Sequence, residues 1–155
     1  TYEESRFMAY NAIVHGAQAV LYWGTHVLEP EDQLWSDLLD VSRELRALEP
    51  GIVGKPPETA PVSDGDDTYA SIGAEGPVLM LRRTGDDWVL IAVNESYAGI
   101  GFDVSQLPDE LNGKSLYRLY SDEAVTVHNN SFRDGIRGYD VHVYATSRRF
   151  EAPLP

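Results

Sequence analysis

The sequence predicts an α+β fold in which two helices and one strand precede a small antiparallel β-sandwich. Two changes of pattern along the 155 residues support this class. Apolar residues recur at helical intervals over most of 1–50, and with a period of two over 68–155. Between them, 51–67 is rich in Pro, Asp and Gly and predicts a linker or an irregular wrap. We therefore place the domain boundary in this middle stretch.

Both helices carry signals at their ends. Thr1 and Glu4 have the spacing of a capping box, and Gly16 offers a stop for the first helix. The second helix is predicted to begin at Pro30, which suits a first helical position, and to end at Pro50. Its apolar stripe comprises Leu34, Leu38, Val41, Leu45 and Leu48.

Between the helices, Ala19–Trp23 is apolar throughout, which is the pattern of a strand covered on both faces in a parallel sheet. A single strand of this kind cannot pair its backbone or cover its faces alone. The order helix, strand, helix, followed by a Pro-rich passage, is typical of the end of a (β/α)₈ barrel, and a whole barrel needs about 250 residues. We expect most of that barrel to lie outside this chain.

Beyond the boundary, short runs of alternating polarity predict strands with turn signals between them. The predicted strands are Thr68–Ile72, Val78–Arg83, Trp88–Asn94, Gly99–Val104, Ser115–Tyr120, Ala124–His128 and Tyr139–Ala145. Short strands connected by tight turns predict a sandwich.

Charge and composition exclude several classes of function. Twelve Lys and Arg stand against 25 Asp and Glu, and the formal charge of −13 disfavours nucleic acid and anionic membranes as partners. The absence of cysteine excludes disulfides, thiolate metal sites and a cysteine nucleophile. No basic and apolar leader opens the chain, so we expect a signal peptide to be absent or removed, and the sequence leaves cytoplasmic and secreted locations open.

Three segments carry a family resemblance. Residues 4–24, with His-Gly-Ala at the helix end and Tyr-Trp-Gly at the strand end, resemble the seventh helix and eighth strand of barrel glycoside hydrolases. Residues 89–95 and 138–144 resemble strands of the β domain that often follows such barrels. The resemblance implies the C-terminal segment of an enzyme acting on glycosidic bonds, with an oligo- or polysaccharide as ligand.

In such barrels the substrate lies at the C-terminal ends of the strands, so the resemblance implies that Trp23 and His26 contact sugar. A flat indole suits the C–H face of a sugar ring. The plainer alternatives are a buried core aromatic for Trp23 and a solvent-facing loop residue for His26.

Hydrolysis needs two carboxyl groups across the scissile bond, and no convincing pair is visible. Resembling enzymes carry theirs on the fourth and seventh strands, which would precede Thr1. Glu29 is explained by capping beside Pro30. We therefore expect no catalytic residue, no cofactor and no turnover by the isolated chain, and we expect it to bind the missing N-terminal barrel portion or to self-associate.

Other features have plainer interpretations beside the functional ones. Asp64, Asp66 and Asp67 could gather calcium, but a solvated turn is favoured because the full loop pattern is absent, so no metal is expected. His128 and His142 are interpreted as surface histidines.

Two alternatives to a barrel remain open. One is a carbohydrate-binding module or structural accessory β domain, using some of its many aromatics: Tyr69, Trp88, Tyr97, Tyr117, Tyr120, Tyr139 and Tyr144. The other is a self-sufficient α+β domain in which Ala19–Trp23 joins the later sheet.

Overall fold

The computed structural model describes residues 1–66 and 75–153, and the predicted α+β class is confirmed there. The helices are α1 (Tyr2–Val14) and α2 (Gln33–Ile52), with short 3₁₀ turns η1 (Thr25–Val27), η2 (Asp109–Leu111) and η3 (Arg148–Phe150). The strands are β1 (Val62–Asp66), β2 (Val78–Thr84), β3 (Asp87–Val93), β4 (Ile100–Ser105), β5 (Ser115–Arg118), β6 (Ala124–Thr126), β7 (Phe132–Ile136) and β8 (Val141–Ala145). No helix in these two ranges is long and apolar enough to cross a bilayer.

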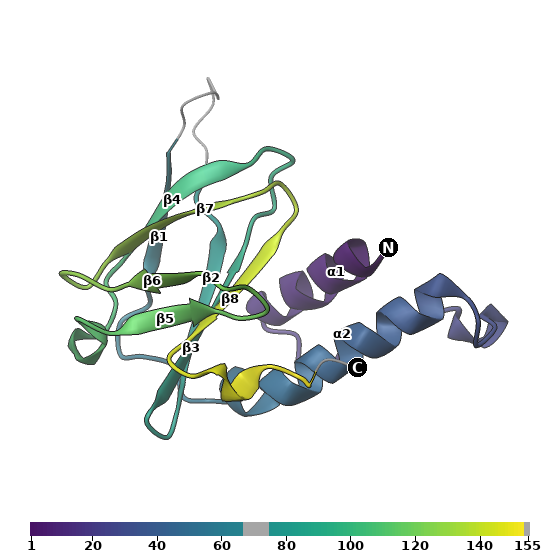
Figure 1. Ribbon diagram of the computed structural model, residues 1–155. Helices are drawn as coiled ribbons and strands as arrows, with labels where there is room; N and C mark the ends of the chain where they lie inside the picture. Colours follow the sequence, from purple (N-terminus) through teal and green to yellow (C-terminus); the bar gives the residue numbers. More distant parts are fainter. Residues whose placement is uncertain (67–74, 154–155) are drawn as a thin grey trace.

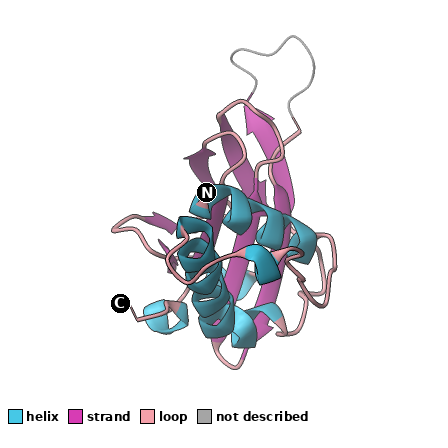
Figure 2. Cartoon of the chain, turned by 90° about the vertical axis from the view of Figure 1, so that its right-hand side faces the viewer, coloured by secondary structure: helices cyan, strands magenta, loops and turns pink. Residues whose placement is uncertain are grey.

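The strands form two antiparallel sheets that pack as a sandwich, as predicted. One sheet has the order β1-β4-β7 and the other the order β2-β3-β8-β5-β6. An apolar core fills the space between them. The two helices cover the outer face of the five-stranded sheet, as Figures 1 and 2 show. The five-stranded sheet is therefore the middle of three layers.

Strand β3, in the middle layer, has a continuously apolar sequence because both of its faces are buried. Leu90 and Ala92 point into the core between the sheets, whereas Val89, Ile91 and Val93 pack under the helices. All five side chains are buried. A continuously apolar strand is usual in parallel sheets, but here helices on one face and a second sheet on the other bury an antiparallel strand equally.

The helix ends differ in part from the prediction. The capping box of Thr1 and Glu4 is present. Helix α2 begins at Gln33 rather than Pro30, because Asp32 occupies the N-cap position and its carboxylate accepts from the backbone N–H of Glu29 at 2.8 Å.

The predicted stop at Pro50 is also wrong, since Pro50 lies inside the last turn of α2. A proline there removes one backbone donor, and the next residue, Gly51, packs closely against strand β3. A Cβ at position 51 would lie 2.6 Å from Cγ2 of Val89.

Two strands lie where the sequence predicts none. Strand β1 lies inside the Pro- and Asp-rich stretch 51–67, and β7 contains the turn-forming pair Asp134-Gly135. The predicted strand Thr68–Ile72 falls outside the described residues. Because α1 and α2 share an apolar core with the five-stranded sheet, the two predicted parts are in direct contact. The boundary itself stays a prediction.

A buried carboxylate joins the helices to the sheet. Glu44 on α2 is 3% exposed and accepts hydrogen bonds from the hydroxyl groups of Tyr2 and Tyr10, both at 2.7 Å. Arg6 of α1 pairs with the same carboxylate, its Nε at 2.9 Å and its Nη2 at 2.8 Å. The Nη1 of Arg6 then donates to the carbonyl of Val141 on β8 at 2.8 Å. Both oxygens of the Glu44 carboxylate therefore accept hydrogen bonds, which a buried charge requires.

We predict that Glu44→Ala destabilises the protein by about 3–5 kcal/mol, because it leaves the guanidinium of Arg6 buried without its partner. Urea unfolding followed by circular dichroism measures this loss. Asp40→Ala is the matched control, since it breaks the exposed Asp40–Arg43 pair on the same helix and should cost at most about 1 kcal/mol. Equal effects of the two substitutions would contradict the structural role of Glu44.

Candidate functional site

The connection between α1 and α2, residues 15–32, runs back along α1. The hydroxyl of Tyr22 donates to the carbonyl of Ser5 at 2.8 Å, which places residue 22 beside the start of that helix. Helix α2 then runs in the same general direction as α1 (Figure 1). Two helices joined by a returning segment are the arrangement of a helix-strand-helix unit.

The predicted strand Ala19–Trp23 is not a strand in this structure. It pairs with neither sheet in the described residues, and the hypothesis that it joins the later sheet is therefore wrong. Val20 packs against the apolar core that the helices share with the sheet, and a ladder needs an adjacent strand edge.

The side chains of this segment nevertheless alternate. Val20 packs against the apolar core of the helices, and Tyr22 is half-buried. Ala19, Leu21 and Trp23 point the other way, with Leu21 88% and Trp23 90% exposed. One packed face and one bare face are the geometry of a strand that lies on helices while its opposite face has no cover.

Trp23 and His26 lie together at the far end of this segment. Gly24 turns the chain with a φ of +85°, and His26 follows on η1. The indole and imidazole meet edge to face, with 6.2 Å between ring centroids. Trp23 is thus not a core aromatic, and both rings are accessible. Their predicted contact with sugar stays a prediction.

The remaining predicted features take structural roles. Asp64 lies in β1, opposite Asp103, rather than in a solvated turn. Asp67 and Tyr69 fall outside the described residues. Within the described ranges, no group of three or more Asp, Glu or His side chains could hold a metal ion. Glu29 is exposed in the turn before α2, and its predicted capping role is wrong because Asp32 holds the N-cap position.

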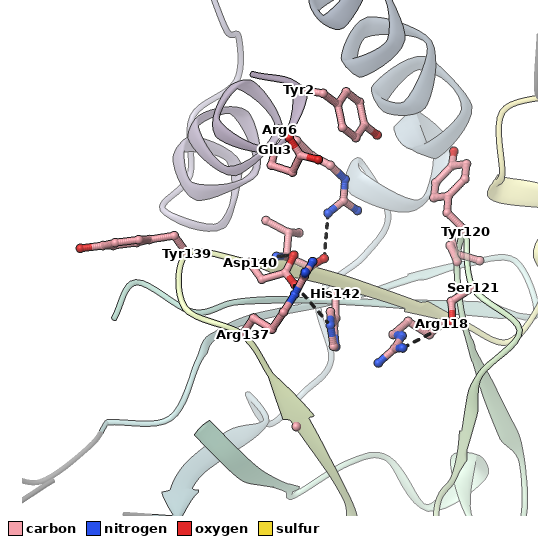
Figure 3. A pocket seen from close by; sticks show the side chains of 13 residues that line it. Tyr2, Glu3, Arg6, Arg118, Tyr120, Ser121, Arg137, Tyr139, Asp140 and His142 are labelled. Atoms are coloured by element: carbon pink, nitrogen blue, oxygen red, sulfur yellow. Dashed lines mark hydrogen bonds and ion pairs between the residues drawn. The ribbon is translucent and has the colours of Figure 1, made fainter. Parts of the chain in front are cut away.

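A pocket, which we call the β8 pocket, lies where the edge of β8 is open. Strand β5 pairs with β8 only at Ala145 and Tyr144, so the outward backbone groups of Val141 meet side chains instead. The N–H of Val141 donates to Asp140 at 2.8 Å, and its carbonyl accepts from Arg6. The cavity is about 450 Å³, and Figure 3 shows its lining side chains, which include Tyr2, Arg6, Arg118, Tyr120, Arg137 and His142.

His142 lies in this pocket and not on the outer surface, so its interpretation as a surface histidine is wrong. Its side chain is 12% exposed, and its Nδ1 lies 3.0 Å from the hydroxyl of Tyr144. That hydroxyl donates its proton to Asp134 at 2.6 Å, so it accepts from an Nδ1–H of the imidazole. The Nε2 of the neutral ring is then left as an acceptor, 4.0 Å from Asp140.

The alternation of β8 was visible in the sequence, but the burial of its second face was not. His142 and Tyr144 share the face that turns toward the three-stranded sheet. A polar residue between two valines usually marks a solvent face, which this sheet does not have at that position.

Burial, and next the guanidinium of Arg118, lower the pKa of His142 to about 4. The carboxylates of Asp140 and Asp134 act in the opposite direction, and Arg6 adds to the lowering. The unfolded chain takes up the proton near pH 6.5, whereas the folded chain does not until about pH 4. Stability linked to this group is therefore complete above pH 6.5 and is lost as the pH falls to about 4.

We predict that His142→Gln flattens the fall in thermal stability between pH 6.5 and 4, because the variant has no imidazole to protonate in the unfolded state. Melting temperatures measured across this range test it. His128→Gln, on an exposed loop, is the control for replacing a histidine. Parallel curves for His142→Gln and the unchanged protein would refute the effect.

The fold is similar to parts of solved alpha-amylases. The crystal structure of alpha-amylase from Geobacillus thermoleovorans, complexed with acarbose, matches with a TM-score of 0.61 at 13% identity, over 94% of this chain and 33% of that chain. A noncanonic maltogenic alpha-amylase, AmyB from Thermotoga neapolitana, matches with a TM-score of 0.55 at 10% identity, over 92% and 36%.

This chain therefore spans about a third of the length of these enzymes. No protein-family model and no curated protein matches it. At these identities the likeness concerns the fold alone. The two helices followed by two antiparallel sheets match part of an alpha-amylase structure.

Proposed function

We propose that this chain is the C-terminal portion of an alpha-amylase-like glycoside hydrolase. In this proposal α1, residues 19–23 and α2 end a (β/α)₈ barrel, and the sandwich follows it. The observation that carries the proposal is the segment 19–23, whose side chains alternate as in a strand while its backbone has no ladder partner in the described chain.

A barrel provides what this segment lacks. Each barrel strand has helices outside, side chains filling the interior, and a neighbouring strand on each edge. Val20 and Tyr22 already contact the helices. Leu21 would fill the interior, where burial contributes about 1.5–3 kcal/mol for a large apolar side chain. The natural cover is the preceding part of the barrel, and a second copy of the chain is its substitute.

Trp23 and His26 would then lie at the C-terminal end of the strand, on the face where barrel enzymes bind substrate. The accessible indole offers a flat surface to a sugar ring, and the nearby imidazole offers a hydrogen-bonding group. The amylase from Geobacillus thermoleovorans was crystallised with acarbose, which supports a carbohydrate as the ligand. The catalytic carboxylates would come from the preceding barrel strands, so this chain contributes binding groups.

A free-standing carbohydrate-binding module has less support. Trp88, the largest aromatic of the sandwich, is buried in the core between the sheets and stacks under Arg83. It therefore offers no platform for a sugar. Tyr97 and Tyr139 are exposed on adjoining loops, but the ring of Tyr139 packs edge to face on Phe7.

We predict that the isolated chain self-associates, and that Leu21→Ser combined with Trp23→Ser shifts it to monomer, because both changes remove bare apolar surface. Size-exclusion chromatography with light scattering measures the mass, and a solvatochromic dye measures the apolar surface. Tyr97→Ser is the matched control, since this side chain is as exposed but lies on the sandwich. A monomer without dye binding before any substitution would refute the proposal.

A further inference from the structure

The three arginines that line the β8 pocket are paired with carboxylates of the chain, and Glu3 and Asp140 also line it. Arg6 is paired with Glu44 at 2.8 Å, and Arg137 bonds Asp140 through its Nε at 3.0 Å. Arg118 forms an ion pair with Glu123 and lies 3.8 Å from Asp134. An anionic ligand would have to compete with these carboxylates for the guanidinium groups. The pocket therefore suits a ligand without net charge.

The hydrogen-bonding groups that remain require a ligand with both donors and acceptors. The Nε2 of neutral His142 and the carboxylate of Asp140, 4.0 Å apart, can each accept a hydrogen bond from a ligand. Arg137 donates to Asp140 through its Nε, and its Nη groups take no part in that bond. The side chain is 85% exposed, so a ligand can reach it. A hydroxyl can donate to the imidazole and accept from the guanidinium at the same time.

Aromatic side chains complete the lining. Tyr2 of α1 and Tyr120, which follows β5, lie near each other at one end of the pocket (Figure 3). Tyr120 is partly exposed and holds an unusual backbone conformation with φ of +62°. Phenol rings provide an apolar surface with a polar tip, which suits the mixed surface of a sugar ring.

We propose that the β8 pocket binds a neutral oligosaccharide, with hydroxyl groups shared between His142 and Arg137. The cavity of about 450 Å³ is in the range of small-ligand sites. This inference depends on the pocket alone. It would stand if the barrel proposal failed, because Leu21 and Trp23 do not line this cavity.

Titration of the ¹⁵N-labelled chain with maltotriose, cellotriose and inorganic phosphate tests the inference by NMR. A trisaccharide should shift the backbone amides of 118–121 and 137–142. Arg137→Ala should weaken that binding about fivefold, which corresponds to one lost hydrogen bond. Arg43→Ala is the matched control, because Arg43 has the same i, i+3 pairing with an aspartate but lies on α2, outside the pocket.

His142→Phe is the second variant and should also weaken the binding, because it removes the Nε2 acceptor and keeps an aromatic ring. Arg137→Ala keeps the test valid if this second variant unfolds, since Arg137 is a surface side chain. The inference is overturned if neither trisaccharide shifts these amides, if phosphate alone does, or if the sugar shifts map elsewhere. Equal affinities of Arg137→Ala and Arg43→Ala would also overturn it.

Discussion

The ion pair between Glu44 and Arg6 is the interaction on which the arrangement of this molecule depends. It fixes α1 against α2, and the third nitrogen of Arg6 fixes both to β8 through the carbonyl of Val141. The same bond supplies a donor to a strand edge that β5 leaves open. Burial, together with the charge of Glu44, raises the pKa of Tyr10, so its hydroxyl stays a donor to the carboxylate. One satisfied charge thereby connects the helices and the sheet.

With the inner sides of both helices committed to the sheet, the segment that joins them lies on the outside. Val20 and Tyr22 use the remaining helix surface, and nothing in the described chain covers Leu21 and Trp23. In a chain that stays monomeric, polar side chains at these two positions would lower the tendency to associate, since exposed apolar patches favour association. Their presence is more readily explained by a covering surface than by the stability of this chain.

Local features such as helix caps could be predicted well from the sequence, whereas the surroundings of each element could not. The capping box at Thr1 is a local signal and was correct. Ala19–Trp23 and β3 carry the same continuous apolar pattern, yet β3 is antiparallel and the other forms no strand. The pattern reports that two faces are to be covered, and not what covers them. Strand β7 was missed because Asp134 and Gly135 resemble a turn, and the burial of His142 depends on a sheet contributed by distant residues.

Helix α1 separates the two surfaces for which we infer ligands and connects them physically. The carbonyl of Ser5 accepts from Tyr22 on the connection, and the next residue, Arg6, lines the β8 pocket. Because neighbouring residues of a helix project about 100° apart, one turn can hold the connection on one side and the pocket wall on the other. The capping box holds the start of that turn. The position of the Tyr22 ring and the wall of the pocket are therefore set by the same few residues at the start of the chain.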